Sequence, residues 1–302
     1  MLDYNQNPIH TISCQDKVIY CFNIDESANI DKQTVDSFGD EWEKFSSFSK
    51  DEIEKIGNEY FDIIDHSILN KESIVLDLGC GSGRWSKYLV NKVKFIEAVD
   101  PSKAVISASM LLNEDENVRV TQASVDNIPF NNNSFDFAMS LGVLHHIPDT
   151  RKALLNLVEK TKVGGYVHLY LYYNLDNRGV FYKFLFKISV YPRLFISKMP
   201  KSIKKILCDI IAVVVYLMLI TFAKIVKNVL STKSFYQKLP LSYYVGKSFN
   251  VVRNDALDRF GTPLEQRFSK IEIENMMQSC GLSELKFSEN APYWHVVGKR
   301  IH

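Results

Sequence analysis

The sequence predicts an α/β protein with a mostly parallel sheet that helices cover on both faces. Two patterns support this. Short apolar runs alternate with helical patterns through the middle of the chain, which is typical of strands joined by covering helices. One of these runs leads directly into a glycine-rich turn and then a helix. The composition, 46% hydrophobic and 24% charged over 302 residues, is that of an ordinary globular protein and argues against wholesale disorder.

The N-terminal part carries weaker signals. Residues 1–35 are polar and weakly patterned, with a short hairpin expected at Val18–Phe22. Lys50–Leu69 is expected to be a helix, because its apolar residues recur every three or four positions and so mark one buried face.

Strands and helices then alternate. The expected strands are Ile74–Leu78, Phe95–Val99, Val118–Gln122, Phe135–Ser140 and Gly165–Tyr173, and the expected helices are Arg84–Asn91, Ser102–Leu112 and Arg151–Lys160. After a long interruption, Ser269 and Glu272 form a capping-box pattern that opens a helix ending before Gly281. Leu285–Ser288 and Tyr293–Gly298 are the expected closing strands.

This order predicts four regions. They are an N-terminal extension (1–49), a ligand-binding core (50–173), a basic and aromatic helical insert (174–265), and a C-terminal helix with closing strands (266–302). Ligands of such sheets bind at the carboxyl ends of the strands.

Charge is distributed unevenly. The formal net charge is only +1, which argues against a surface that binds nucleic acid throughout and makes a nucleic-acid partner unlikely overall. From Arg178 to Lys238, however, twelve Lys or Arg face one acid, Asp209. Such an asymmetry indicates that this segment meets something anionic.

The cysteines and the N-terminus indicate the compartment. The five cysteines are scattered, odd in number and without a C-x-x-C pair, so neither a metal site nor a disulfide framework is expected. The N-terminus lacks a basic stretch followed by an apolar run. We therefore expect a cytoplasmic protein, with association at the inner face of the membrane left open by the basic segment.

The strongest motif is the run from Val75 to Gly83, in which a strand leads into three glycines at alternate positions. Glycine lets a backbone approach a ligand closely. Asp100, about twenty residues further on, stands where an acid binds a ribose. A dinucleotide loop prefers Gly or Ala where Arg84 stands, and Asp77 would repel a phosphate but suit a cation. A glycine turn that binds no ligand is the alternative.

Together these motifs resemble the class I S-adenosylmethionine-dependent methyltransferases, in the broad group that acts on small molecules. The resemblance implies a Rossmann-like seven-stranded sheet with an antiparallel last strand and a helical insert between strands 5 and 6. It implies S-adenosylmethionine as cofactor, with Asp100 on the ribose and Val125 and Asp126 on the adenine. The implied cofactor-binding residues are Asp77, Gly79, Cys80, Gly81, Gly83, Asp100, Pro101, Val125, Asp126, Ser140 and Leu141.

Candidate catalytic residues are His145 and His146, which end the loop after the fourth strand. A histidine there can take a proton from a hydroxyl at neutral pH. Packing or capping of the next helix is the alternative. Methyltransferases that act on nucleobase amines resemble one another in an Asn/Asp-Pro-Pro-aromatic tetrapeptide after the fourth strand. The Ser140–Val143 turn lacks this tetrapeptide, so nucleobase amines are disfavoured as acceptors.

The insert allows two interpretations. Ile206–Leu230 is apolar, but its uncharged run Ile210–Ala223 is only 14 residues, short of the ~20 that span a bilayer. Either the segment 178–238 contacts an anionic membrane surface, or its apolar residues are core and its lysines a solvated face.

Where the chain returns to the sheet, Asp258, Phe260 and Arg267 are candidate contacts of a small-molecule acceptor. The expected reaction is methylation of an oxygen on a sugar, a lipid-linked saccharide or a quinone-like ring. An RNA-modifying methyltransferase and a catalytically idle cofactor-binding relative remain as alternatives.

Overall fold

The computed structural model describes residues 1–25, 29–42, 49–229, 236 and 239–302. The chain divides into two compact units. The core unit comprises Met1–Asn174 and Leu264–His302, and the helical unit comprises Leu175–Pro263.

The core unit is built on one sheet with the order β1-β2-β5-β4-β3-β6-β7-β9-β8. Its strands are β1 (His10–Cys14), β2 (Lys17–Cys21), β3 (Ile74–Leu78), β4 (Phe95–Asp100), β5 (Val118–Gln122), β6 (Phe135–Leu141), β7 (Thr161–Tyr170), β8 (Leu282–Phe287) and β9 (His295–Arg300). From β5 to β7 all neighbours run parallel, whereas β9 lies antiparallel between β7 and β8. The predicted mixed α/β fold with an antiparallel last strand is confirmed.

The strand count differs from the predicted seven, since the described residues form nine. The two additional strands are the hairpin β1–β2, whose second strand pairs in parallel with β5. An unpaired β5 would present a row of open N–H and C=O groups, which the hairpin pairs instead. The N-terminal extension is therefore part of the sheet.

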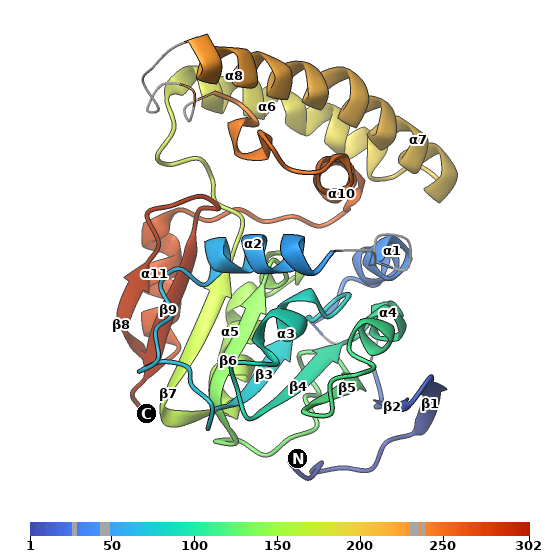
Figure 1. Cartoon of the computed structure of the whole chain (residues 1–302), viewed down its shortest axis with the longest axis vertical. Coiled ribbons are helices and arrows are strands. Elements are labelled where there is room, and N and C mark those ends of the chain that lie inside the picture. The colour runs from blue at the N-terminus through green and yellow to red at the C-terminus, as the bar shows by residue number, and fades with distance from the viewer. Residues whose placement is uncertain (26–28, 43–48, 230–235, 237–238) are drawn as a thin grey trace. The chain divides into compact units, whose positions relative to one another are not determined.

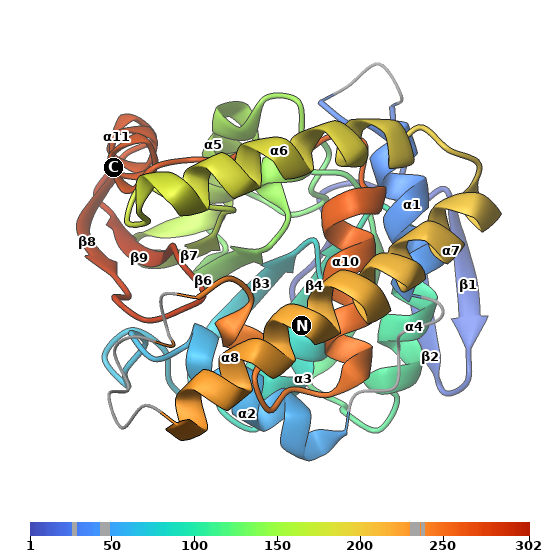
Figure 2. The ribbon, with the colours of Figure 1, turned by 90° about the horizontal axis from the view of Figure 1, so that it is seen from above.

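Helices cover both faces of this sheet. The core unit contains α1 (Lys32–Trp42), α2 (Lys50–Tyr60), α3 (Arg84–Leu89), α4 (Ala104–Leu111), α5 (Thr150–Lys160) and α11 (Lys270–Ser279). Figures 1 and 2 show α2, α3 and α4 on one face and α5 and α11 on the other. The central strands are apolar on both sides as a result: in β3, Val75 packs into one core cluster and Leu76 into the other.

Local chemistry sets several helix ends. The predicted capping box at Ser269 and Glu272 is present, and Ser49 with Glu52 forms a second one that opens α2. The predicted helix 50–69 is too long, because α2 ends at Tyr60. Beyond it the Asp65 side chain binds the hydroxyl and N–H of Ser67, a local turn that competes with the helix.

Other boundaries also shift. The strand expected at Gly165–Tyr173 spans Thr161–Tyr170 and begins with a register irregularity opposite β6. The closing strands lie at Leu282–Phe287 and His295–Arg300, a few residues from their predicted positions. Apolar pattern alone fixes strand ends poorly, because pairing with a neighbour decides where a strand stops.

The helical unit contains α6 (Val180–Ile196), α7 (Lys201–Ile211), a π-helical turn (Ala212–Tyr216), α8 (Leu217–Val229), a short 3-10 turn (Ser242–Tyr244) and α10 (Phe249–Gly261). Cys208, Ala212, Tyr216 and Ile220 form a small core with Val252, Ala256 and Phe260 of α10. The segment Ser202–Val229 is helical over 28 residues and, by length and composition only, could cross a membrane; 22% of its most apolar stretch is buried. A soluble protein's core helix passes the same test, but such a helix is mostly buried.

Candidate cofactor site

The turn after β3 has a backbone that only glycine adopts easily. Gly79, Gly81 and Gly83 all have positive φ, between +53° and +81°. A Cβ on Gly79 would lie 2.5 Å from the Cγ atoms of Val143, and one on Gly83 would lie 2.9 Å from Leu112. The turn is thus held tightly between the β6 loop and α4, with its backbone N–H groups brought close to the end of β4.

Asp100, the last residue of β4, holds this turn through hydrogen bonds. Its carboxylate accepts from the Gly81 N–H at 3.0 Å, and from the Ser102 N–H and hydroxyl at 2.8 and 2.6 Å. Pro101 follows and is partly exposed; its carbonyl accepts from Gln122 at 3.2 Å. Burial raises the pKa of the Asp100 carboxyl. The carboxylate of Asp100, which is predicted to bind the ribose, is therefore already oriented by hydrogen bonds from Gly81 and Ser102.

Asp77 is the second carboxylate of the site and is fully buried. One oxygen accepts from the Ser86 hydroxyl at 2.7 Å, and the other, Oδ1, has no hydrogen-bond partner in the protein. Burial, together with the nearby Asp100 charge, raises the pKa of Asp77 to about 7. The buried Ser82 hydroxyl is also without a partner. A buried polar atom without a protein partner is open to a water or a ligand.

These residues fit a cationic nucleoside. A phosphate would add negative charge beside two buried carboxyls, whereas an ammonium or sulfonium group would favour the ionised form of Asp77. Cys80 lies in the same turn, and burial raises the pKa of its thiol well above the ordinary value. Cys80 is therefore a neutral packing residue of the turn and not a nucleophile.

Val125 and Asp126, expected on the adenine, follow β5. Val125 is buried, with 7% of its surface exposed. Asp126 accepts hydrogen bonds from the Asn29 N–H, Lys152 and Asn156 at 2.8–2.9 Å. Burial raises the pKa of this carboxyl, but these donors outweigh it and lower the pKa below its ordinary value. Asp126 thus stays ionised and retains little acceptor capacity, so an adenine contact there remains a prediction.

The end of β6 contributes main chain more than side chains. The Ser140 hydroxyl donates to the Leu78 carbonyl at 2.9 Å and ties β6 to the start of the glycine turn. Leu141 is buried in the apolar core, and Gly142 has φ of +80° and donates to the Tyr170 carbonyl. The predicted contacts of Ser140 and Leu141 would therefore come from their backbone.

The two histidines lie in the 3-10 turn Leu144–His146 and are buried. The ring of His145 stacks on Tyr172 with centroids 3.9 Å apart, and neither of its nitrogens has a hydrogen-bond partner in the protein. Burial, with the nearby His146 and Arg267, lowers the pKa of His145 well below its ordinary value. His145 is therefore neutral at pH 7, with a nitrogen able to accept a proton or a hydrogen bond.

His146 has a different environment. Its Nδ1 lies 2.7 Å from the Leu264 carbonyl and must donate to it, since a carbonyl only accepts. Its ring also packs edge-on against Phe38 at 4.9 Å. These contacts fix His146 as part of the structure around His145.

The three residues predicted to contact the acceptor lie in different units. Arg267 lies in the core unit beside the histidines: its guanidinium is 5.2 Å from the Tyr172 ring centroid and binds Glu265 at 2.7 Å. Phe260 is buried in the core of the helical unit, and Asp258 accepts a long hydrogen bond from Thr262. The structure thus brings Arg267 to His145 but gives Asp258 and Phe260 roles inside the helical unit.

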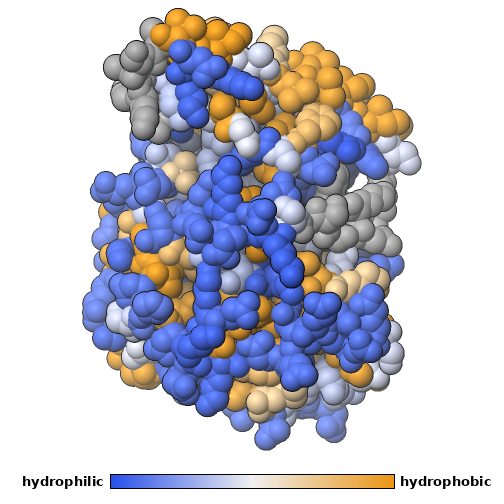
Figure 3. Space-filling view, viewed as in Figure 1, coloured by the Kyte–Doolittle hydropathy of each residue, from blue (hydrophilic) through white to orange (hydrophobic). Residues whose placement is uncertain are grey.

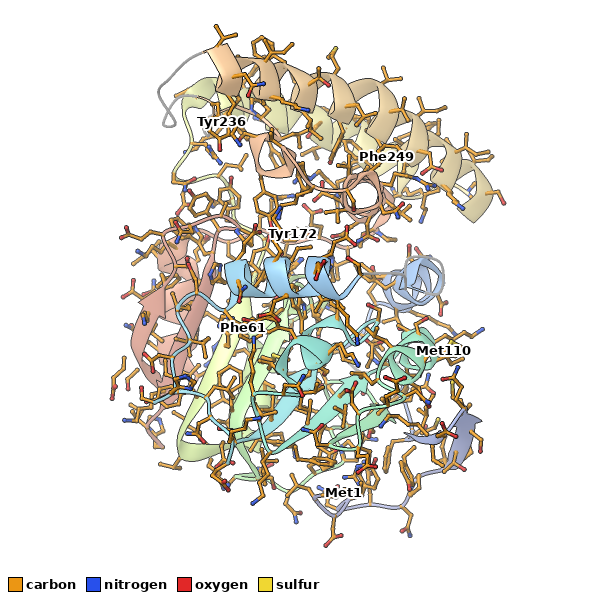
Figure 4. All side chains as sticks on the ribbon, viewed as in Figure 1. Met1, Phe61, Met110, Tyr172, Tyr236 and Phe249 are labelled. Carbon is orange, nitrogen blue, oxygen red and sulfur yellow. The ribbon has the colours of Figure 1, made fainter. Side chains whose placement is uncertain are left out.

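Sequence reasoning missed two residues of this site. Ser86 orients Asp77, and Tyr172, labelled in Figure 4, stacks on His145. Tyr172 continues the alternation of His168 and Tyr170 along β7, so it was detectable as a residue on one side of that strand. The contact of Tyr172 with His145 was not detectable, because it joins segments that follow two different strands. Among the described residues no cluster of three His, Cys, Asp or Glu could hold a metal ion.

Comparison with known proteins agrees with this geometry. Residues 76–169 match the family model described as a methyltransferase domain. The match confirms the resemblance to class I methyltransferases and supports S-adenosylmethionine as the cofactor.

Three relatives illustrate the range. An uncharacterized methyltransferase of Mycobacterium tuberculosis is 30% identical over 106 residues, 35% of this chain and 54% of the relative. The tRNA (carboxymethyluridine(34)-5-O)-methyltransferase of Saccharomyces cerevisiae is 33% identical over 102 residues, 32% of this chain and 35% of the relative. The ubiquinone biosynthesis O-methyltransferase of Rickettsia bellii is 28% identical over 115 residues, which are 37% of this chain and 45% of the relative. The chain spans about half the length of the first of these relatives, and the helical unit lies outside the matched family model.

Proposed function

We propose that this chain, whose residues 76–169 match a methyltransferase domain, transfers a methyl group from S-adenosylmethionine to an oxygen of a small molecule. The observation that carries the cofactor part of the proposal is the buried Asp77, whose Oδ1 has no partner in the protein and whose pKa burial raises to about 7 beside the glycine turn. A cationic ligand would supply the partner that the protein does not. The oxygen acceptor rests on the neutral His145.

The residues that would hold the cofactor divide by chemistry. The Asp77 carboxylate and the Gly79–Gly83 turn would bind the methionine part, and Asp100 with Pro101 the ribose. Val125 and Asp126 would border the adenine, and the backbone of Ser140 and Leu141, at the end of the strand beside β3, would border the methionine part. The bound cofactor supplies a methyl group on a positively charged sulfur, which reacts by in-line displacement. The protein's task is then mainly to position the acceptor and to exclude water.

His145 is the residue we assign to the acceptor. Being neutral, it can accept the hydrogen bond of a hydroxyl and take its proton as the new bond forms. Its lowered pKa makes it a weak base, so orienting the hydroxyl is the larger part of this role. Arg267 lies close to His145 with its charge already paired to Glu265, and we keep it as a candidate acceptor contact. Asp258 and Phe260, which the sequence also suggests as acceptor contacts, make their contacts inside the helical unit, so we assign the acceptor role only to His145 and Arg267.

The acceptor class that we favour is a sugar, a lipid-linked saccharide or a quinone-like ring. A relative whose name assigns it to ubiquinone biosynthesis supports an aromatic hydroxyl as one such acceptor. We propose that the protein is cytoplasmic and contacts the inner face of the membrane through the segment 178–238.

The second candidate function is methylation of RNA. The relative named as a tRNA methyltransferase and the basic segment Arg178–Lys238 both favour it. A catalytically idle relative, which binds the cofactor without turnover, is the third. The three differ in which cellular fraction receives the methyl group.

The experiment that tests the proposal has two steps. First, calorimetric titration with S-adenosylmethionine and with its demethylated product should give binding, whereas NADH should give none; binding of NADH alone would overturn the assignment of the cofactor. Second, protein incubated with methyl-labelled cofactor and a cell extract should label the lipid or polar metabolite fraction. Label in RNA instead would support the second candidate, and cofactor binding without label in any fraction the third. Asp77→Asn protein is the control for both steps.

A further inference from the structure

The helical unit exposes an unusual amount of apolar side chain. Of the large hydrophobic residues that are exposed in the described chain, all but seven lie between Val180 and Phe249; the others are Met1, Ile9, Val18, Met110, Val163, Ile271 and Ile301. Single exposed apolar residues need no explanation, but a contiguous group of them marks a binding surface.

The continuous helix of α7, the π-helical turn and α8 is apolar on two opposite faces. Cys208, Ala212, Tyr216 and Ile220 are buried against α10. Ile210, Val214, Met218 and Phe222 follow each of these by two residues, and each is more than half exposed. A step of two residues turns an α-helix by about 200°. The second set therefore lies on the face opposite α10.

A second apolar stripe runs along α6. Phe184, Ile188, Tyr191 and Phe195 recur at spacings of four, three and four residues, and each is about half exposed or more. Figure 3 shows apolar side chains gathered along the part of the helical unit that α7 and α8 form, with hydrophilic ones beside them. We call the two stripes together the apolar face of the helical unit.

Basic side chains border this face. Lys183 and Lys187 stand one position before Phe184 and Ile188 on α6, and both are exposed. Lys224 and Lys227 are exposed at the end of α8. The acid of this helix, Asp209, is paired with Arg253 of α10 at 2.8 Å and adds no net negative charge to the face. The face thus combines apolar stripes with a positive border.

The face of the helix that packs on α10 argues against a simple membrane-spanning helix. α10, which packs against it, carries Arg253, Asp255, Asp258 and Arg259, and the Asp255 carboxylate binds the hydroxyls of Tyr216 and Tyr244. Such charged groups do not enter hydrocarbon without large cost. A helix with one face on a charged neighbour and the other face exposed and apolar lies in the plane of an interface.

We propose that the helical unit docks on an anionic lipid bilayer, with the apolar face inserted at the headgroup boundary and its bordering lysines on acidic headgroups. A second copy of this chain is a poorer occupant, because two surfaces of the same positive charge would repel each other. The proposal concerns a binding surface and does not depend on methyl transfer.

The first test is sedimentation with sucrose-loaded vesicles, using the whole protein. Vesicles of phosphatidylcholine with phosphatidylglycerol should pellet it at low salt, and a high-salt wash should release most of it. Phosphatidylcholine alone should bind at least ten times more weakly. Equal binding to both vesicles would overturn the electrostatic part of the proposal, and retention after the wash would show a spanning helix.

Variants locate the surface. The triple change Val214→Ser, Met218→Ser and Phe222→Ser should weaken binding at least about 30-fold. Val163→Ser, Ile271→Ser and Ile301→Ser together are the matched control, since they remove three equally exposed apolar side chains from the core unit and should leave binding unchanged. Lys183→Gln with Lys187→Gln should weaken binding on the order of 20-fold, compared with Lys55→Gln and Lys94→Gln in the core unit.

Three results would contradict the proposal. The apolar triple variant could bind vesicles like the unchanged protein. The protein could form a stable dimer that does not bind vesicles and that the same variant dissociates, which would make the face an interface between copies. RNA could bind more tightly than vesicles at the same salt, with no effect of the apolar changes. Circular dichroism and cofactor titration of each variant confirm that it is folded.

Discussion

The Ser86 hydroxyl donates to one oxygen of the buried Asp77 carboxylate at 2.7 Å and leaves the other oxygen without a partner. Burial raises the pKa of this carboxyl to about 7, so a large fraction of the free protein is protonated there at neutral pH. A bound cation favours the ionised form. We therefore expect the pair to couple cofactor binding to proton release.

The first prediction is that cofactor affinity depends on pH through Asp77. Affinity should rise as the pH increases toward 7 and become constant above about pH 8, because below the pKa of the free protein the ligand must first displace a proton. Calorimetric titration with the demethylated cofactor across this range measures it. Asp77→Asn should bind at least tenfold more weakly and lack the rise, while Glu72→Gln on the surface should behave like the unchanged protein. If the affinity of Asp77→Asn rose by the same factor with pH, the pH dependence would come from titration of the ligand and not of Asp77.

The second prediction concerns stability without ligand. The pKa of Asp77 is higher in the folded protein than the ordinary value of 3.8 in an unfolded chain. The unfolded state therefore releases its proton first, and the free energy of unfolding should fall as the pH rises from about 4 to about 7. A shift of about three units corresponds to a loss of roughly 4 kcal/mol. Urea unfolding at several pH values should show that Asp77→Asn lacks this part of the pH dependence; identical curves for the two proteins would refute it.

The third prediction tests the glycine turn. Gly79→Ala should abolish cofactor binding or reduce it at least 100-fold, because its Cβ would lie 2.5 Å from Val143 and alanine is strained at φ of +77°. Gly179→Ala in the helical unit is the control, since nothing lies within 4 Å of its Cβ. The melting temperature should fall for Gly79→Ala and stay unchanged for Gly179→Ala. Normal binding by Gly79→Ala would show that the turn is not the cofactor site.

The fourth prediction separates the two histidines. His145→Gln should reduce methyl transfer into the labelled extract fraction by about 10²-fold, the cost of a misplaced acceptor, with cofactor affinity retained. His146→Gln should instead lower the melting temperature, because His146 donates to the Leu264 carbonyl and packs on Phe38. If both changes reduced transfer and stability in the same proportion, His145 would be a packing residue.

How much of this site was predictable depends on distance along the chain. The glycine turn and Asp100 follow from the sequence because each stands at the end of a recognisable strand, and parallel strands bring those ends together. The stacking of Tyr172 on His145 does not, since the sequence does not fix how far β6 and β7 extend beyond their paired residues. The same limit applies to Arg267, whose approach to His145 depends on the return of the chain after the helical unit.

The fold shows a similar division. Buried strands such as Ile74–Leu78 were predicted to the residue, because their apolar runs end at glycines. A short hairpin was expected at Val18–Phe22, but the structure forms the hairpin from His10–Cys14 and Lys17–Cys21 and pairs it with β5, since edge pairing leaves little pattern. The helix Ser202–Val229 is apolar on two opposite faces, so its period could not tell the buried face from the exposed one. Only the packing of α10 shows which face is covered.

The last prediction concerns the buried ion pair between β4 and β5. Arg119 binds Glu97 through two nitrogens at 2.9 and 2.6 Å and also donates to the Leu2 carbonyl, which fixes the N-terminal segment to the sheet. The Glu97 side chain is fully buried. Arg119→Leu would leave this carboxyl without its partner and should destabilise the protein by about 3–5 kcal/mol.

A matched comparison separates the loss of a buried pair from the loss of charge. Lys94 and Glu72 form an exposed pair at 3.7 Å, so Lys94→Leu should change stability little. The double change Arg119→Leu with Glu97→Gln should recover part of the loss, because the remaining buried group is no longer charged. Burial raises the pKa of the Glu97 carboxyl to about 7, so urea unfolding of all three variants is measured at about pH 8, where the carboxyl of the unchanged protein is ionised. If Arg119→Leu cost no more than Lys94→Leu, the Glu97 carboxyl would have to be protonated in the folded protein, and the pair would hold the N-terminal segment without contributing an ionic interaction.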